Sequence, residues 1–340
     1  MTLHATAWAA GPIGPETIGL PGETQQLRSA VQGIRGLCRQ VEQAANQLKQ
    51  ANPPEGQNGK AVTALSRAAQ RTGRQLEADS QQLERLGDAI DHASDVLGNA
   101  QQGVDDLKRR WRDARETFRD AIHGAKNAPK DVGALIHSID ADVSDGHGAQ
   151  FKRQAGLQFT SVGQGQAHAM LLEDGSKVEQ AITAYRHTAR SIVDEYSDLM
   201  QKVKNADEKL AEKLPRQRDH ATAEAQEMNG HEGGGNDHQG ISAPAGIRSV
   251  AEEIHAAAQT IDQAAHRLED IRLAIRAGRM LPEDERVGSN DGFKRDWDEH
   301  FDKVRHQLNG ARRAADHVAD RLRDADENGA ADIRQALRDD

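Results

Sequence analysis

A heptad pattern of apolar side chains runs through most of this chain and predicts long paired helices. The clearest stretch covers residues 62–121, where steps of alternately three and four residues meet an apolar side chain everywhere except at Thr72 and Asp79. A 3.5-residue period places these side chains in one stripe along a helix that supercoils around a partner. At about 1.5 Å per residue, this helix would be about 90 Å long.

The same pattern predicts several further helices. One begins near Leu27 and is ended by the turn at residues 52–56; it is too short to cover the long stripe. A shorter helix is expected between Val132 and Val143. Three more stripes follow, at residues 178–210, 247–275 and 293–325. Because a short loop joins the last two, they are expected to form an antiparallel hairpin.

Glycine- and proline-rich segments divide the chain. Pro12, Pro15 and Pro21 oppose helix formation near the N-terminus and predict an extended leader that is poorly ordered alone. Trp8 lies in this leader, where it is either a docking residue or locally packed. The expected segments are a leader (1–22), an N-terminal helical hairpin (23–128), a middle helical segment (129–216), a flexible Gly/His-rich linker (217–245) and a C-terminal hairpin (246–340).

Composition supports an all-α fold, namely long antiparallel helical hairpins with heptad packing in an extended, coiled-coil-like bundle. Aromatic residues make up only 3% of the chain, and the straight side chains that favour helices are abundant. The net charge of −10 arises from interleaved acidic and basic residues, so we expect no nucleic acid partner. No run reaches the roughly 20 apolar residues of a transmembrane helix.

Residues capable of catalysis or metal binding do not form a recognisable pattern. Cys38 is the only cysteine, and we expect it to be a small buried apolar side chain. His147 and His300 have no accompanying nucleophile and are expected to be solvated. Irregular spacing argues against a metal site at the linker histidines 220, 231 and 238. We therefore predict no catalytic residue, no cofactor and no metal.

Large side chains on the stripes are the candidate partner-binding residues. They serve either as intramolecular core or as an association surface. The predicted set is Leu97, Val104, Trp111, Phe118, Trp297 and Phe301. Since the first helix covers only part of the long stripe, its second half must meet either the helix at residues 178–210 or another protein.

Two regions carry a resemblance to a known family. One runs from Gly19-Leu20-Pro21-Gly22-Glu23 through the turn at residues 53–59 to about residue 121. The other is Gly288-Ser289-Asn290-Asp291-Gly292-Phe293, followed by Trp297 and Phe301, with Ala325-Asp326-Glu327-Asn328 near the end of the last helix. Together they resemble the W-x-G superfamily of type VII (ESX-type) secretion substrates and the helical secretion-signal hairpins of actinobacterial proteins.

The chain departs from that family at its signature motifs. No W-x-G stands at either turn, and the family's Y-x-x-x-D/E export signal is missing, because Met200 lies four places after Tyr196 and Ala189 four places after Tyr185. Export of this chain would then depend on a signal carried by a partner.

The resemblance implies a non-enzymatic type VII secretion-associated protein, exported as a substrate or carrier. Its expected partners are another helical secretion-family protein or a second copy, and the secretion machinery. The expected location is secreted or attached to the cell envelope. The alternative is a cytoplasmic coiled-coil scaffold, or a secretion chaperone that is not itself exported.

Overall fold

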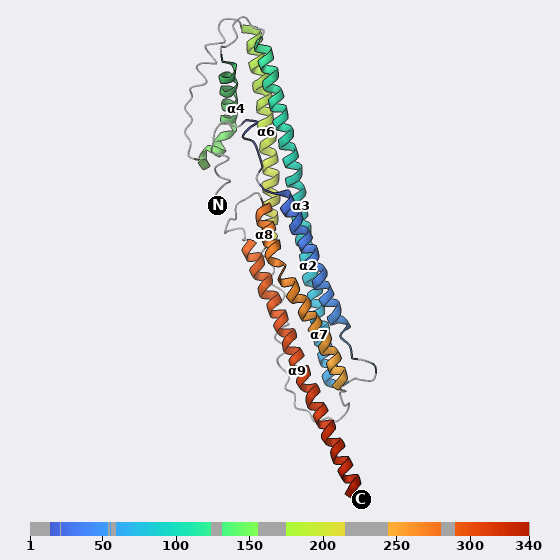
Figure 1. The fold of residues 1–340 in the computed structure, drawn as a ribbon. Coiled ribbons are helices and arrows are strands. Elements are labelled where there is room, and N and C mark those ends of the chain that lie inside the picture. Colours follow the sequence, from blue (N-terminus) through green and yellow to red (C-terminus); the bar gives the residue numbers. More distant parts are fainter. Residues whose placement is uncertain are drawn as a thin grey trace. The chain divides into compact units, whose positions relative to one another are not determined.

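The computed structural model describes residues 14–20, 22–53, 55, 59–123, 131–155, 175–214, 244–279 and 290–339. Within these ranges the regular structure is helical and contains no strand, which confirms the all-α fold class. The helices are α2 (Thr24–Gln50), α3 (Lys60–His123), α4 (Val132–Ala155), α6 (Gly175–Lys213), α7 (Pro244–Ala265), α8 (Leu268–Gly278) and α9 (Asn290–Asp339), coloured along the chain in Figure 1.

The chain divides into two compact units, each assembled from separate stretches of sequence. Unit 1 contains the described parts of Met1–Thr24, His92–Glu208 and Gly278–Pro282. Unit 2 contains the described parts of Gln25–Asp91, Lys209–Ala277 and Glu283–Asp340. The division falls inside α3, so the expected N-terminal hairpin contributes to both units. The expected linker at residues 217–245 lies almost entirely outside the described residues.

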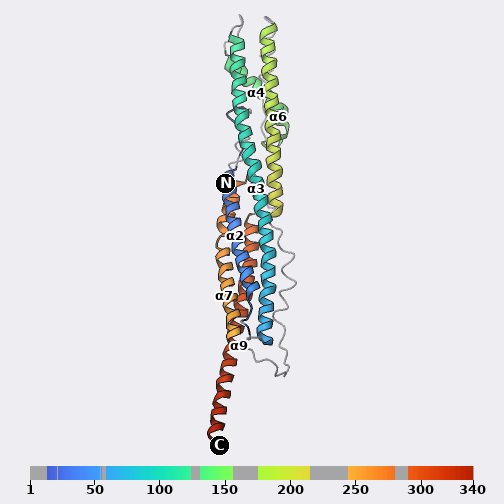
Figure 2. The ribbon, with the colours of Figure 1, turned by 90° about the vertical axis from the view of Figure 1, so that its right-hand side faces the viewer.

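In unit 2, contacts link α2, α3, α9 and α7 in a closed ring of antiparallel helices. The contacts between α7 and α9 show that these two helices are antiparallel, because residue numbers rise along α7 as they fall along α9. The pairs are Arg248 with Asp320, His255 with Arg312, and Asp262 with Arg305. The remaining sides of the ring are marked by Cys38 with Ser80 for α2–α3, Asp79 with His300 for α3–α9, and Thr260 with Gln47 for α7–α2. Figure 2 shows these helices side by side.

Heptad spacing explains the core of unit 2. On α2, the buried side chains Leu27, Ile34, Val41 and Leu48 stand seven residues apart. A second series continues across the break between α7 and α8, at Ile247, Ile254, Ile261, Leu268 and Ile275. Burial of each Leu or Ile stabilises the fold by about 1.5–3 kcal/mol. Both series lie in the core of unit 2.

A glycine lets α2 and α8 approach closely. A Cβ atom added to Gly33 would lie 2.7 Å from Cγ1 of Ile271, which is closer than van der Waals contact allows. The missing side chain therefore creates the space that Ile271 fills in the core.

Unit 1 consists of the second half of α3 packed against α4 and α6, as both Figure 1 and Figure 2 show. Its core is one cluster of buried side chains contributed by all three helices: Val104, Leu107, Trp111, Phe118, Ile122, Leu135, Ile136, Ile139, Val143, Ile182, Tyr185, Ala189, Ile192, Val193 and Tyr196. An ion pair between Arg279 and Asp207 adds a charged contact, with Nε to Oδ1 at 3.0 Å and both side chains buried.

Residues 14–20, here called the strap, also belong to this core. The strap begins with a turn in which the amide of Ile18 donates to the carbonyl of Gly14, 3.0 Å away. Ile18 is only 3% exposed and belongs to the same apolar cluster. Although this segment was expected to be an extended leader, its described part is packed. Trp8 and the rest of residues 1–13 lie outside the described residues.

Among the helices that the structure describes, none carries a stretch long and apolar enough to span a bilayer.

Candidate functional site

The second half of the long α3 stripe is covered by the chain itself. Leu97, Val104, Trp111 and Phe118 are each at most 2% exposed, and the last three share a cluster with side chains of α4 and α6. Of the two alternatives for this stripe, the structure realises the one in which residues 178–210 pack against it. These four residues form intramolecular core and present no surface to a partner in this structure.

The two predicted residues on α9 are also buried. Trp297 and Phe301 are 3% and 1% exposed, and their ring centroids lie 5.2 Å apart. Both side chains contribute to the core of unit 2. They too are unavailable to a partner in this structure.

A buried polar network lies within the apolar core of unit 1. The hydroxyl of Tyr185 donates to Oδ1 of Asp140 at 2.6 Å, and Nε1 of Trp111 donates to the same oxygen at 3.1 Å. The guanidinium of Arg115 donates to Oδ2 of Asp140, with Nη2 at 2.7 Å and Nε at 3.2 Å. Each helix of the unit thus supplies part of the network, which fixes their mutual register because a buried carboxylate without partners is costly.

Two hydrogen-bond donors of this network, Tyr185 and Arg115, have raised pKa values. Burial, followed by the hydrogen bond to Asp140 and then the charge of Asp140, raises the pKa of Tyr185 well above its ordinary range. Desolvation is the largest single effect on Arg115 and lowers its pKa, but the hydrogen bond to Asp140 and the nearby negative charges together outweigh it and raise the pKa of the guanidinium. At neutral pH, Tyr185 and Arg115 therefore remain donors.

A second buried polar pair lies in unit 2. Nε2 of His300 is 2.7 Å from Oδ2 of Asp79, and the two side chains are 13% and 9% exposed. The prediction that His300 is solvated is therefore wrong. Asp79 is one of the two polar interruptions of the long stripe, and this histidine is what accommodates it.

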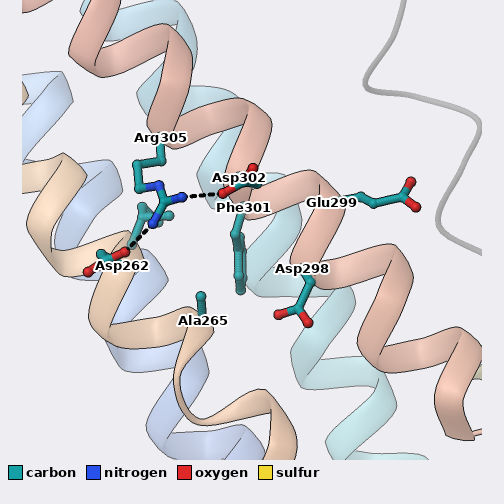
Figure 3. Close-up of a pocket in the computed structure, with 8 residues that line it drawn as sticks. Asp262, Ala265, Asp298, Glu299, Phe301, Asp302 and Arg305 are labelled. Carbon is teal, nitrogen blue, oxygen red and sulfur yellow. Dashed lines mark hydrogen bonds and ion pairs between the residues drawn. The ribbon is translucent and has the colours of Figure 1, made fainter.

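Two pockets lie along the α7–α9 pair in the part of the chain that the structure describes. A pocket of about 280 Å³ is floored by Phe301 and bordered by Asp262, Asp298 and Arg305 (Figure 3). In Figure 3, Arg305 reaches between the two helices and pairs with Asp262 of α7 and Asp302 of α9. These ion pairs engage Asp262, Asp302 and Arg305 with one another, and Asp298 pairs with Lys294.

A wider open pocket of about 730 Å³ continues along the same two helices. It is lined by a mixture of cationic and anionic side chains, including His255, Arg312, Arg313 and Asp316. Nη1 of Arg312 donates to Nδ1 of His255 at 2.8 Å. Exposed pairs of this kind contribute only about 0–1 kcal/mol each. The surface is a solvated seam between helices without the enclosure of a ligand site.

Possible metal ligands and the thiol of Cys38 are both present in the described part of the chain. No group of three or more His, Cys, Asp or Glu side chains there is placed to hold a metal ion, and the linker histidines lie outside the described residues. Cys38 is half-buried against the Ser80 carbonyl. Burial, then the charges of Glu42 and Glu84, raise the pKa of its thiol to about 11, which keeps it protonated and unreactive at neutral pH.

The end of α9 extends beyond its intrachain partner. The Arg248–Asp320 ion pair lies near the start of α7, which begins at Pro244, while α9 continues to Asp339. Figures 1 and 2 both show these last turns running past α7. Val318 is 38% exposed, and residues 323–328 are all exposed. The end of α9 is therefore an exposed helical surface that α7 does not cover.

Comparison with known proteins finds no match: no protein-family model, curated protein or solved structure is significantly similar to this chain.

Proposed function

We propose that this chain is a non-enzymatic helical protein associated with type VII secretion, and that it acts by pairing with another helical protein. Support for the secretion setting comes from the resemblance of its N- and C-terminal hairpin regions to the W-x-G superfamily. The antiparallel packing of α2 on α3 and of α7 on α9 is compatible with a hairpin family.

The observation that carries the pairing proposal is the end of α9. From about residue 325 to Asp339 the helix has no α7 residue opposite it, a length of about four turns. An isolated helix of this length is only marginally stable in water. A helical partner would supply the missing contacts.

The partner surface proposed here differs from the six residues expected from the stripes. Those side chains lie in the cores, whereas Val318 and Leu322 lie where α9 loses its cover. In the sequence, apolar residues continue at similar spacing through Ala325 to Ile333 and Leu337. Such a series suits the apolar face of a second helix.

Co-purification tests this pairing. The full chain is co-expressed with each small helical protein encoded beside its gene, and capture is compared between the wild type and the double variant Leu322→Asp with Leu337→Asp. Wild-type capture that the double variant loses, with helicity unchanged by circular dichroism, supports the proposal. Arg323→Ala is the matched control, because Arg323 is exposed on the same segment and lies outside the apolar series. Equal capture by all three proteins contradicts it.

A further inference from the structure

The strap packs in unit 1 but is followed along the chain by a helix of unit 2. The described contacts of the strap lie in unit 1, as do Gly22, Glu23 and Thr24, whereas the rest of α2 belongs to unit 2. A segment with this connectivity can form the same contacts with its own chain or with a second copy.

Specific contacts hold the strap against α3 and α6. The hydroxyl of Tyr196 donates to the carbonyl of Gly19 at 2.7 Å and accepts from the Gly19 amide at 3.4 Å. Burial raises the pKa of Tyr196 to about 12, so this hydroxyl keeps its proton at neutral pH. Nη1 of Arg115 pairs with Oε1 of Glu16 at 2.6 Å. Recognition thus combines backbone, charge and the buried side chain of Ile18.

The turn that holds the strap against its own chain is strained for any residue but glycine. Gly22 has a φ of 100°, and a Cβ atom added there would lie 2.9 Å from the carbonyl oxygen of Gly278. The Glu23 amide donates to that same oxygen at 3.3 Å. This turn is the natural hinge, because the strap can leave its own chain only if the backbone opens here.

We infer that the strap exchanges between two copies of this chain, so that Glu16, Ile18 and Gly19 of one copy complete the α3–α6 face of the other. Exchange keeps the strap contacts of Glu16, Ile18 and Gly19, since each copy receives the segment that it donates. It gives up only the closed turn, including the Glu23–Gly278 hydrogen bond. The closed monomer is favoured by the high effective concentration of its own strap, and the dimer by protein concentration. This inference does not depend on the secretion proposal.

Isotope-mixed photo-crosslinking tests the exchange. Leu20, which packs on the same cluster, is replaced by benzoylphenylalanine in ¹⁴N- and ¹⁵N-labelled full chains. The two are mixed, unfolded in urea, refolded at high concentration and separated by size with light-scattering detection. After irradiation, mass spectrometry of the dimer should find strap peptides linked to α3 or α6 peptides of the other isotope. Failure to form a dimer, or a dimer with only same-isotope links, overturns the inference.

Two glycine variants sharpen the result. Gly22→Ala strains the closed turn but leaves the strap contacts intact, so the dimer fraction should rise, which simple destabilisation would not produce. Gly19→Ala is the control, because no atom lies within 4 Å of the added Cβ, and its dimer fraction should match the wild type. A dimer fraction that is unchanged or lower in Gly22→Ala overturns the exchange.

Discussion

His300 on α9 and Asp79 on α3 form a buried pair, with Nε2 and Oδ2 2.7 Å apart, between residues that are 221 positions apart in the sequence. In an otherwise apolar helix interface, this pair sets which residue of α3 lies opposite which residue of α9. Apolar side chains alone would tolerate a shift by one heptad at little cost, whereas a shift here leaves both polar groups without a partner.

Removing one member of the pair should destabilise unit 2. His300→Leu leaves the Asp79 carboxylate buried and unpaired, so the free energy of unfolding should fall by about 1–3 kcal/mol. The double variant Asp79→Leu with His300→Leu should recover most of that loss, because neither polar group remains. Urea unfolding of the two single variants and the double variant gives the coupling energy directly. Additive losses would show that the two side chains do not interact.

Removing Asp140 from the buried network of unit 1 should lower the free energy of unfolding more than removing one member of the Asp79–His300 pair. Asp140→Ala removes the buried carboxylate that accepts from Tyr185, Trp111 and the mostly buried guanidinium of Arg115, so we expect a loss of about 3–5 kcal/mol. Equilibrium urea unfolding followed by Trp fluorescence measures it. Asp142→Ala is the control, because the Asp142–Arg186 ion pair is substantially exposed and should cost about 1 kcal/mol or less. Similar losses in the two variants would argue against a structural role for the network.

Alanine substitution should have opposite effects on stability at two helical glycines, Gly33 on α2, which lies against α8, and Gly310 on α9, which has open space around it. Gly33→Ala places a Cβ atom 2.7 Å from Ile271 and should destabilise the protein by about 1–3 kcal/mol. Gly310→Ala meets nothing within 4 Å and should stabilise α9 by about 0.5–1 kcal/mol. Thermal unfolding of both variants beside the wild type tests the contrast. Equal stability of Gly33→Ala and Gly310→Ala would contradict the close packing of Gly33 against Ile271.

The Cys38 thiol should impose an alkaline limit on stability. Its pKa rises from 9.0 to about 11 on folding, so the folded state favours the protonated thiol. The resulting stabilisation is complete below pH 9 and is lost as the pH rises from 9 to 11. Relative to Cys38→Ala, the wild type should therefore lose unfolding free energy across this window in urea titrations. A constant difference between the two proteins would contradict the raised pKa.

The same shift predicts slow alkylation. At pH 8 the folded chain should react with iodoacetamide about 100-fold more slowly than the urea-unfolded chain, because the thiolate fraction falls tenfold for each unit by which the pKa is raised. Equal alkylation rates for the folded and unfolded chains would show that the Cys38 thiol is exposed to solvent and would contradict its raised pKa.

Periodicity predicted the helices well because a heptad is a local property of the chain. The series at Leu76, Leu83, Ile90 and Leu97 is buried as its spacing requires. Sequence could not identify what covers the stripe, since apolar faces are chemically alike and several helices were candidates. The structure settles this for the second half of α3, where α4 and α6 supply the cover.

Polar partners were the least predictable feature. Asp79 could be recognised as an interruption of the stripe, but nothing local indicates a histidine 221 positions away as its partner. Asp140 similarly follows the buried Ile139 and reads as a break in an apolar face, although it is the centre of a network. The strap was missed because its glycines and prolines indicate a segment without helix, and packing of such a segment depends entirely on distant residues such as Tyr196.

Fractionation of the native host tests the central proposal most directly. The chain is followed by antibody in cytosol, cell envelope and culture filtrate, in a strain with its type VII secretion ATPase and in a matched deletion strain, with a cytosolic enzyme as the lysis marker. The account predicts protein in the envelope or filtrate that disappears when the ATPase is deleted. Protein confined to the cytosol of both strains would contradict export and favour the scaffold or retained chaperone.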